Sequence, residues 1–435
     1  MLGIVKRDLY LKKLISCMWD GQVKVITGIR RCGKSYLLHT IFRNYLLEQG
    51  VKEDHILSYE LDLARDIRYR NPLELAKKVR ERIKGSPDRF YLFVDEIQMS
   101  DEVPNPYNPK GKTIAFYDAL NDLKSLPNLD IYVTGSNSRM LSSDILTEFR
   151  GRSDDVRVHP LSFSEYYAFV GGDKTNAFDN YAFYGGMPLI LSRPDETAKM
   201  DYLKALISEV YLKDIVERKK IKREDVLSAA LDFLCSSVGS LTNPNNIANS
   251  LNSRQKLAGQ DTVAANTVKA YIGHLIDSYL FEECRRYDVK GRDYFDYPNK
   301  YYCDDLGLRN ARIGFRQQEM THIMENIIYN DLRVRGCQVD IGIVYGTEKN
   351  RAGQTVQVLR EIDFIAMRGG KKTYIQSAYA MENEAKIASE SKPLSLTGDS
   401  FPKIIVRHDI RKRWYDENGV LNIGIIDFLL DDTVI

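Results

Sequence analysis

Short apolar runs rich in β-branched and aromatic residues recur through the first part of the chain. They occupy residues 23–27, 56–61, 90–94, 129–134 and 156–159. A run of this length, bounded by polar or turn-forming residues, is typical of a strand that is buried on both faces. Because stretches with helical spacing of apolar residues separate the runs, the pattern predicts an α/β core built on a parallel sheet.

Helices are expected between these strands and at the start of the chain. Residues 4–20 have an apolar side at helical spacing. Asn71 precedes a proline that opens a helix over residues 72–83, since proline is accepted in the first helical turn. Another helix is expected over residues 113–124. The proline-containing loop 103–111 before it is expected to be a tolerated surface loop, with a lid or a partner contact as the alternative.

The first apolar run leads into segment 28–35, Gly-Ile-Arg-Arg-Cys-Gly-Lys-Ser, which fits the phosphate-loop pattern G-x-x-x-x-G-K-[ST]. A polyphosphate needs inward-facing donors and close approach of the backbone. Gly28 and Gly33 have no Cβ, so the chain can turn tightly and direct amide groups at the anion. The following helix adds unpaired amides and its positive dipole end. Lys34 supplies a charge for the β- and γ-phosphates, and Ser35 supplies a hydroxyl for Mg²⁺.

The phosphate loop, residues 28–35, predicts a set of nucleotide-binding residues. They are Gly28, Ile29, Arg30, Arg31, Cys32, Gly33, Lys34, Ser35 and Tyr36. Lys34 is expected to act on the transferred phosphate as well as to bind it. Arg30 and Arg31 either contact phosphate or are solvated loop charges, and the sequence leaves both interpretations open.

Two adjacent acids follow the third apolar run directly. Asp95 would hold Mg²⁺, either directly or through water. Glu96 is placed to polarise an attacking water, a role that needs a carboxylate within hydrogen-bond reach. Such a pair can also cap a helix or face solvent, but the phosphate loop upstream favours the catalytic interpretation.

Polar residues further along are candidates for contact with the γ-phosphate. Asn137 is the first choice and Ser136 the second, because they follow the run 129–134, which could form a strand between the other two. An ordinary strand-ending turn is the alternative. Arg152, and after it Arg150, could project toward the γ-phosphate and stabilise transition-state charge. A basic helix end is an equally good interpretation of the two arginines.

Composition limits the class of protein. A chain of 435 residues predicts two to four domains, and 43% hydrophobic with 28% charged residues is typical of a soluble globular protein. Sixty-two basic and 60 acidic residues leave a net charge of +2, which argues neither for nor against nucleic acid. No apolar run approaches membrane-spanning length, and the charged first residues do not resemble a signal peptide. Six cysteines without C-x-x-C spacing and six dispersed histidines predict a reducing cytoplasm and no metal cluster.

Taken together, these motifs resemble the predicted AAA-type ATPases of bacteria and archaea that carry a C-terminal domain of unknown function. The matching segments are 25–35, 92–98, 134–138, 151–152, 160–163, 184–188, 300–302, 304–307 and 361–364. The resemblance implies ATP as the nucleotide, with Asp95 and Glu96 in the Mg²⁺ and water roles. It also implies extra strands between the strand of the phosphate loop and the strand of the two acids. It implies no biological process.

Four domains are expected along the chain. They are a P-loop ATPase core at 1–160, a helical lid region at 161–224, a winged helix-turn-helix at 225–300 and a C-terminal α/β domain at 301–435. Within the lid region, residues 184–188 form a Gly-Gly turn between helices. In related ATPases, by the resemblance alone, this turn packs near the nucleotide.

The winged-helix expectation rests on three helices and a hairpin. The helices cover 226–238, the segment capped by Asn243, and 265–275, and the hairpin joins 281–287 to 294–297. The third helix could enter the major groove of double-stranded DNA. The phosphate contacts would then be Lys269, Arg285, Arg286, Lys290 and Arg292. A protein-interaction or lid role is an equal alternative, because Lys269 is the only positive charge on that helix.

The last expected domain resembles the core of a restriction endonuclease. Glu325, the segment 361–363 with Glu361 and Asp363, and the run 374–378 resemble its acids and its acid-x-Lys strand, which hold a metal and activate water. Gln376 stands where the acid is expected, and Ala378 where the lysine is expected. A site with one firm carboxylate should bind Mg²⁺ poorly, so we expect a catalytically silent binding module.

The sequence therefore predicts an Mg²⁺-dependent ATPase whose hydrolysis drives changes in DNA- or partner-bound domains. The expected ligands are ATP and Mg²⁺, with double-stranded DNA or a protein as the partner and no membrane. A slow nucleotide-gated switch and an ATP-gated nuclease effector are the alternatives. Kinase activity is a weaker alternative, because an adjacent acidic pair suits water activation better. Whether Arg152 acts within its own subunit or a neighbour's stays open.

Overall fold

A computed structural model describes most of the chain. The described residues are 5–135, 153–257, 262–316, 319–350, 353–381, 384–410 and 412–435. The chain divides into two compact units. The first comprises Met1–Pro160 with Asp277–Tyr279, and the second comprises Leu161–Ile276 with Leu280–Ile435. In the described residues the first unit contains one sheet and the second contains two, and each unit has its own hydrophobic core.

The first unit contains a five-stranded sheet. Its strands are β1 (Val23–Thr27), β2 (Ile56–Glu60), β3 (Phe90–Asp95), β4 (Leu129–Thr134) and β5 (Ser153–Arg157). Their order is β2-β3-β4-β1-β5, and every neighbouring pair is parallel. Every residue of β1, β3 and β4 is buried, as expected for a parallel sheet with both faces covered. The predicted parallel α/β core is confirmed, and β4 lies between β1 and β3.

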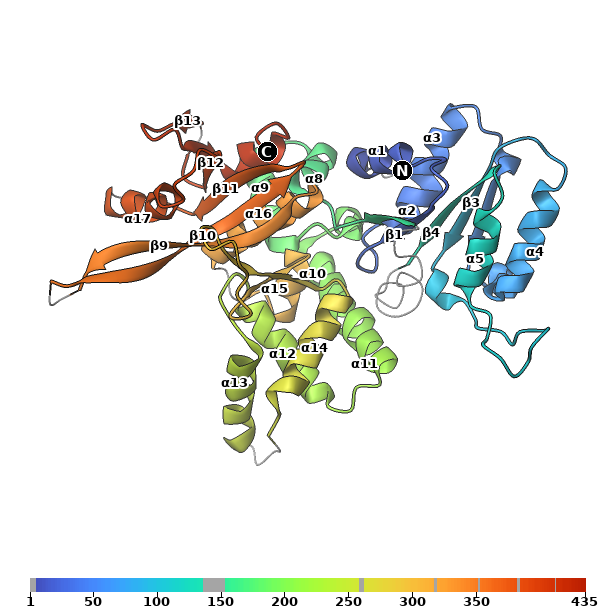
Figure 1. Ribbon diagram of the computed structural model, residues 1–435, viewed down its shortest axis with the longest axis horizontal. Helices are drawn as coiled ribbons and strands as arrows, with labels where there is room; N and C mark the ends of the chain where they lie inside the picture. The colour runs from blue at the N-terminus through green and yellow to red at the C-terminus, as the bar shows by residue number, and fades with distance from the viewer. Residues whose placement is uncertain are drawn as a thin grey trace. The chain divides into compact units, whose positions relative to one another are not determined.

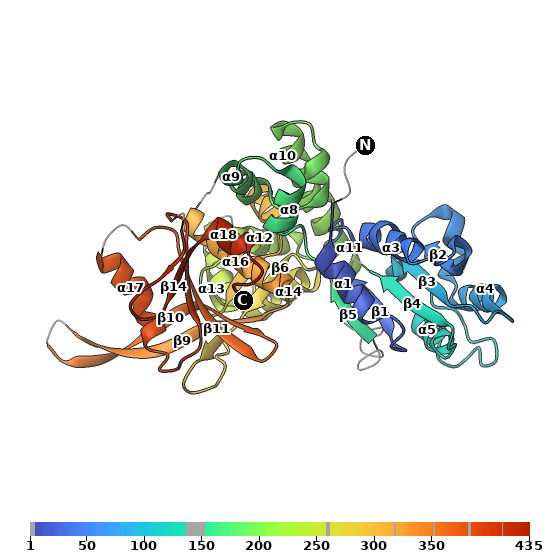
Figure 2. The same cartoon turned by 90° about the horizontal axis from the view of Figure 1, so that it is seen from above.

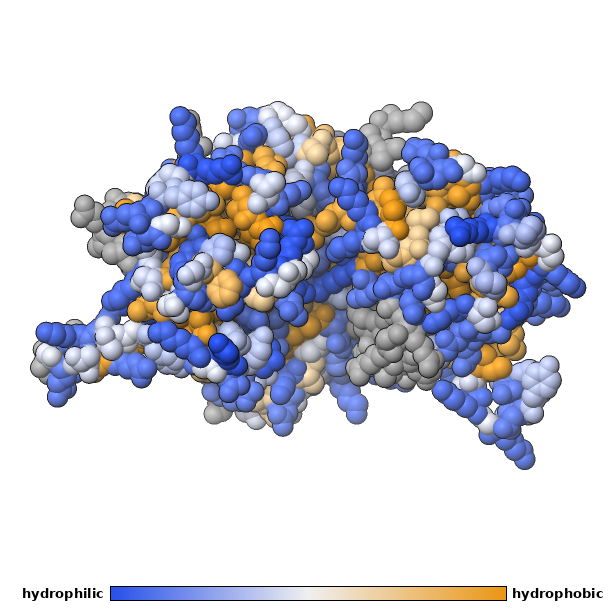
Figure 3. Space-filling view, turned by 45° about the horizontal axis from the view of Figure 1, so that its top comes forward, coloured by the Kyte–Doolittle hydropathy of each residue, from blue (hydrophilic) through white to orange (hydrophobic). Residues whose placement is uncertain are grey.

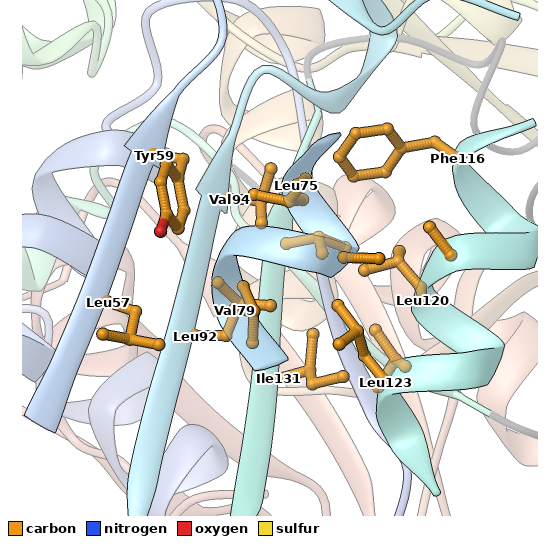
Figure 4. Packing of buried hydrophobic residues seen from close by; sticks show 14 of the residues in the cluster. Leu57, Tyr59, Leu75, Val79, Leu92, Val94, Phe116, Leu120, Leu123 and Ile131 are labelled. Carbon is orange, nitrogen blue, oxygen red and sulfur yellow. The ribbon is translucent and has the colours of Figure 1, made fainter. Parts of the chain in front are cut away.

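Helices cover both faces of this sheet (Figure 1). They are α1 (Asp8–Ser16), α2 (Lys34–Tyr36), α3 (Arg43–Glu48), α4 (Pro72–Ile83) and α5 (Phe116–Lys124), and a π-helical segment, Leu37–Phe42, joins α2 to α3. Figure 4 shows α4 and α5 packing on one face through Leu75, Val79, Leu120 and their neighbours. The expected start of α4 is confirmed by Asn71, whose side-chain oxygen accepts a hydrogen bond from the amide of Leu73 at 2.9 Å.

Two of these helices are shorter than predicted. The chain expected to be helical over 4–20 leaves the helix after Ser16, and the amide of Trp19 then donates to Asp130 at 3.1 Å. Helix α5 begins at Phe116 rather than at residue 113, because Ile114 pairs with Val103 through two backbone hydrogen bonds of 2.8 and 3.0 Å. That bridge closes the proline-containing loop.

The second unit begins with helices. They are α8 (Phe163–Val170), α9 (Lys174–Tyr184), α10 (Glu196–Ala205), α11 (Lys213–Lys219), α12 (Glu224–Ser236), α13 (Pro244–Leu257) and α14 (Ala265–Asp277). A π-helical segment, Leu206–Leu212, joins α10 to α11, so Glu196–Lys219 is one continuous helical run within the region expected to be helical. The amide of Asn246 donates to the side chain of Asn243 at 2.8 Å, which is the expected cap of α13.

The Gly-Gly turn after α9 is fixed by an acid from a later helix. Asp305 precedes α15 (Leu306–Arg312) and accepts hydrogen bonds from the amides of Gly186 at 2.7 Å and Leu308 at 2.9 Å. A Cβ on Gly186 would lie 2.1 Å from the carbonyl oxygen of Leu161, and one on Gly307 would lie 2.0 Å from that of Tyr184. Backbone segments meet here, so close packing explains these glycines.

The three-helix segment is followed by strands that pair differently from the predicted hairpin. Strand β6 (Phe281–Cys284) pairs antiparallel with β8 (Lys300–Cys303), and not with residues 294–297. Strand β7 (Arg286–Asp288) instead joins a larger sheet next to β9 (Gln338–Lys349). The expected pairing is present in part, on the free edge of β7. Tyr287 and Tyr294 form an antiparallel bridge, the amide of Phe295 donates to the carbonyl of Arg286 at 2.9 Å, and the amide of Asp288 donates to that of Asp293 at 2.8 Å.

That larger sheet has seven strands in the order β13-β14-β12-β11-β10-β9-β7. The further strands are β10 (Thr355–Arg368), β11 (Lys371–Ala378), β12 (Lys403–Arg407), β13 (Trp414–Tyr415) and β14 (Leu421–Gly424). Figure 2 shows α17 (Glu384–Ser395) on one side of it, and α16 (Met320–Val334) with α18 (Ile425–Leu430) on the other. Strands β9 and β10 continue beyond it as a long antiparallel hairpin (Figure 1).

The surface is that of a polar protein. On the face shown in Figure 3, hydrophilic residues predominate and apolar residues are interspersed among them. Among the described residues there is no helix with the length and apolar character that crossing a bilayer would need.

Candidate nucleotide-binding site

The phosphate loop connects β1 to α2, and its two glycines adopt backbone conformations that favour glycine. Gly28 has φ of 141°, and a Cβ there would lie 2.0 Å from the carbonyl oxygen of Val158. Gly33 has φ of 102° and immediately precedes α2. Any other residue would be strained at both positions, so the two glycines of the phosphate-loop pattern are needed for the backbone conformation of this turn.

The back of the loop is held by Arg7, a residue that sequence analysis missed. Its side chain is buried, and its guanidinium donates to the carbonyl oxygens of Cys32 at 3.1 Å and His159 at 2.7 Å. The thiol of Cys32 also donates to the carbonyl of Val158 at 3.3 Å. These contacts tie the loop to the chain just after β5. Each joins residues far apart in sequence, and no local pattern signals them.

Lys34 is buried, with 3% of its surface exposed. Its ammonium donates to the carbonyl oxygens of Gly28 and Ile29, each at 3.1 Å. Among the described residues no carboxylate forms an ion pair with it. Neutral carbonyls hold the ammonium in place without neutralising it, so its charge can act on an anion at the loop.

The expected magnesium ligands converge. Asp95 ends β3, and its buried carboxylate accepts a hydrogen bond from the hydroxyl of Thr134, at the end of β4. Burial alone would raise the pKa of Asp95, but the neighbouring His39 and the hydroxyls of Thr134 and Ser35 outweigh it and leave the pKa below its ordinary value. The carboxylate is therefore ionised at neutral pH beside the Ser35 hydroxyl, which is the oxygen donor set that Mg²⁺ prefers.

Glu96 has a left-handed backbone, with φ of 53°. Its amide donates to the hydroxyl of Thr134 at 3.1 Å, so Thr134 contacts both members of the acidic pair. The side-chain amide of Gln98 donates to the Glu96 carboxylate. A non-glycine residue at positive φ is uncommon, and here the hydrogen bonds from both sides hold it.

The other predicted site residues differ in position. Ile29 and Cys32 are buried behind the loop, whereas Arg31 is exposed with φ of 62°. Arg30 and Tyr36 are half-buried. The remaining predicted contacts to the γ-phosphate, Ser136, Asn137, Arg150 and Arg152, lie outside the described residues.

Sequence analysis also missed polar neighbours of the acidic pair. The Nε2 atom of His39 lies 3.6 Å from a carboxylate oxygen of Asp95, and Glu60 is close to both. Glu60 ends β2 and His39 lies in the π-helical segment, so neither follows the phosphate loop in a recognisable motif. Thr134 could have been predicted as a site residue, because it ends the apolar run that was expected to form a strand between the other two.

The predicted DNA contacts in the second unit differ in how exposed their side chains are. Arg286 is buried and its guanidinium lies over the ring of Phe295, which argues against a role in phosphate contact. The guanidinium of Arg285 lies over the ring of Tyr294, at 4.4 Å. Lys290 and Arg292 are exposed at the turn that follows β7.

The carboxylates that sequence analysis compared with those of an endonuclease surround a lysine. Lys300, at the start of β8, is 5% exposed. Its ammonium lies 2.7 Å from Glu325, 2.7 Å from Glu361 and 3.7 Å from Asp363. Burial opposes its charge, but the three carboxylates hold the pKa of Lys300 well above its ordinary value. The cation among these acids is thus a side chain, which sequence analysis did not anticipate.

Asp363 lies beside Gln376, the residue at the position where sequence analysis expected an acid. The amide of Ser377 donates to the carboxylate of Asp363 at 2.8 Å, and the amide of Asp363 lies 3.4 Å from the side-chain oxygen of Gln376. Burial, followed by the charge of Glu325, raises the pKa of Asp363 well above its ordinary value. Gln376 donates in turn to Glu390 at 3.1 Å.

Comparison with protein families gives two matches. Residues 20–167 match the family described as AAA domain. Residues 175–319 match a domain of unknown function, DUF8612. The first match contains the phosphate loop and both acids on a parallel sheet, so this part of the chain is similar to AAA-type P-loop domains in both sequence and fold.

Relatives and solved structures are similar over most of the chain. An uncharacterised protein of Haemophilus influenzae is 29% identical over 441 residues, covering 98% of this chain and 99% of that protein. One of Methanocaldococcus jannaschii is 26% identical, covering 88% and 79%. A Walker-type ATPase of Pyrococcus abyssi is 17% identical with a TM-score of 0.47, covering 71% of this chain and 96% of that one. The ORC1 protein of Aeropyrum pernix in complex with DNA is 12% identical with a TM-score of 0.32, covering 72% and 94%. These two TM-scores are too low to carry an argument about function.

Proposed function

We propose that this protein binds and hydrolyses ATP with Mg²⁺ and couples its nucleotide state to a domain that binds DNA or a protein partner. The observation that carries the proposal is the convergence of Lys34, Ser35 and Asp95, which come from two separate segments of the chain. Among the described residues no carboxylate pairs with the buried ammonium, and the ionised Asp95 lies beside the Ser35 hydroxyl. This set of groups fits a triphosphate with its cation.

Each residue has a distinct part in the proposed reaction. Lys34 binds the β- and γ-phosphates and stabilises charge on the transferred group. Ser35 and Asp95 would hold Mg²⁺, which neutralises phosphate charge when bound. Glu96 orients and polarises the attacking water. The Glu96 amide donates a hydrogen bond to Thr134, and the Gln98 side chain donates one to the Glu96 carboxylate. These two bonds hold Glu96 in its left-handed conformation and orient the carboxylate before substrate arrives.

ATP turnover by the full-length protein tests this proposal. We expect Mg²⁺-dependent release of phosphate, and we expect Glu96→Gln to lower turnover at least about 100-fold while ATP stays bound. Glu48→Gln, on the exposed end of α3, is the matched control and should leave both unchanged. Absence of ATP affinity in calorimetry of the intact protein would falsify the proposal.

The coupling part of the proposal concerns the second unit. Three helices precede the β6–β8 pair, and the exposed Lys290 and Arg292 lie at the adjoining turn. These basic groups support contact with a nucleic-acid backbone. Turnover measured with and without double-stranded DNA checks this step. If DNA neither binds nor changes turnover, the DNA part of the proposal is wrong.

We propose further that the endonuclease-like region binds without cutting. Lys300 already neutralises part of the charge of the three acids, and Gln376 supplies no carboxylate. We expect no cleavage of DNA or RNA in Mg²⁺ or Mn²⁺. Cleavage that disappears in Asp363→Ala would contradict this part and would favour the nuclease alternative. A cytoplasmic location completes the proposal, supported by six free cysteines.

A further inference from the structure

A group of potential metal ligands adjoins the proposed ATP site. A nitrogen of His39 and carboxylate oxygens of Glu60 and Asp95 all lie within 4.8 Å of one another. Glu60 and Asp95 are the last residues of β2 and β3, and they are direct partners across this parallel pair. His39 lies four residues after Ser35 in the helical run that follows the loop, so it reaches the same edge of the sheet.

The imidazole of His39 is oriented by its other nitrogen. Its Nδ1 atom lies 3.1 Å from the hydroxyl of Ser58, and its ring packs edge-on against Phe93 with centroids 6.0 Å apart. A hydroxyl that accepts from Nδ1–H places the lone pair on Nε2, and this is how proteins commonly prepare a histidine for a metal. In the tautomer in which Ser58 accepts from Nδ1–H, the lone pair of Nε2 faces the acids and can bind a metal.

The Nε2 atom is buried and has no hydrogen-bond partner among the described residues. Its 3.6 Å separation from Asp95 is too long for a good hydrogen bond. Metal–ligand bonds of about 2.1 Å put two ligands of one ion roughly 3 to 3.5 Å apart, so the spacing suits a shared cation. Arg65 pairs with one oxygen of Glu60 from the exposed side, and the carboxylate has a second oxygen for a metal.

We propose that His39, Glu60 and Asp95 form a three-ligand site for a divalent transition metal of the Mn²⁺, Co²⁺ or Zn²⁺ class, which binds without nucleotide. One imidazole and two carboxylates favour these ions over Mg²⁺, which prefers oxygen ligands alone. The site shares Asp95 with the proposed function. It does not use Lys34, so metal binding and ATP binding can be separated experimentally.

Titration of the nucleotide-free, full-length protein with Co²⁺ tests the site. We expect one equivalent to bind, with visible absorption bands that report nitrogen coordination, and calorimetry should give the same stoichiometry. His39→Gln and Glu60→Gln should each weaken binding at least tenfold. Ser58→Ala, which removes the orienting hydroxyl, should weaken binding by a smaller factor.

The controls separate metal binding from folding and from ATP binding. His55→Gln is the matched control, because His55 lies in the same unit near Asp54 and Asp88 but outside the three-ligand group. It should bind Co²⁺ as the unaltered protein does. Thermal unfolding without metal should be alike for all variants, and Lys34→Ala should lose ATP and keep Co²⁺.

Three results would overturn the inference. They are no Co²⁺ binding by the unaltered protein, equal binding by folded His39→Gln, and binding that appears only with ATP. Normal Co²⁺ binding without any ATP affinity would instead refute the proposed function and leave the metal site intact.

Discussion

Two buried lysines, Lys34 in the first unit and Lys300 in the second, do opposite things with the same charge. Lys34 is held by two neutral carbonyl oxygens at 3.1 Å, whereas Lys300 lies among three carboxylates, two of them at 2.7 Å. The first arrangement orients an ammonium and leaves its charge uncompensated. In the second arrangement the ammonium charge of Lys300 is paired with carboxylates of the protein itself. Burial of a lysine therefore says little about function until its acceptors are known.

This contrast also separates two kinds of acidic site. Asp95 has a pKa below its ordinary value because hydroxyls and an imidazole stabilise its charge. Asp363 has a pKa well above its ordinary value, because burial and the neighbouring Glu325 disfavour its charge. An acid that ionises readily can hold a cation, whereas one in a crowded acidic group depends on Lys300 for compensation.

The largest expected effect comes from removing the lysine that is fully paired. Lys300→Met leaves buried carboxylates without their cation and should destabilise the second unit by about 3–5 kcal/mol. Urea unfolding measures this loss. Lys371→Met, at an exposed position on β11, is the control and should change stability by less than about 0.5 kcal/mol. A loss below about 1 kcal/mol for Lys300→Met would mean that its ion pairs are not structural.

The next effect comes from removing Lys34, which has no acidic partner among the residues that the structure describes. Lys34→Met should weaken ATP binding at least about 100-fold, because a charge-assisted contact to phosphate is lost. It should cost less unfolding free energy than Lys300→Met, since no buried carboxylate is left unpaired. Calorimetry with ATP, beside the exposed control Lys52→Met, checks both statements. Unchanged affinity would remove Lys34 from the site.

A third buried charge extends the comparison to an acid held by backbone amides. Burial raises the pKa of Asp305 to about 7, although the amides of Leu308 and Gly186 act in the opposite direction. The folded-state pKa of Asp305 is raised, so its protonated form favours the folded state. This contribution to the free energy of unfolding is largest below the unfolded pKa of about 3.9 and is lost as pH rises through about 7. Unfolding free energy should fall between pH 4 and 7, by at most about 1.4 kcal/mol per unit from this group.

Asp305→Asn should reduce that dependence, and urea unfolding at pH 5, 6 and 7 measures it. The slope should not vanish, because burial also raises the pKa of Asp331, to about 6. An unchanged slope in the variant would show that Asp305 is ionised throughout this range.

The smallest expected effect comes from the support of the phosphate loop. Arg7→Met removes the hydrogen bonds to the carbonyls of Cys32 and His159 and should weaken ATP binding about tenfold, since the loop is then less well ordered. Lys12→Met, exposed on α1, is the control. If affinity stays within about twofold, the loop holds its conformation without Arg7.

Local patterns in the sequence were enough to predict the buried strands and the phosphate loop. The runs at 23–27, 90–94 and 129–134 are buried strands, because near-continuous β-branched and apolar residues suit a sheet covered on both faces. The glycines at 28 and 33 mark positive φ angles, which the spacing of the motif already required. Helix ends were less secure, since the start of α5 depends on a backbone bridge from Val103.

What the sequence by itself determined is the chemistry written in short segments: a loop for phosphate, a pair of acids at the end of a strand, and a parallel α/β core. Only the tertiary structure decided which side chains meet there, including Arg7 behind the loop, His39 and Glu60 beside Asp95, and Lys300 among the later acids. The physical reason is the separation along the chain over which each kind of interaction acts. Periodicity and turn geometry act over a few residues, whereas the partner of a buried charge is set by packing between segments that are distant along the chain.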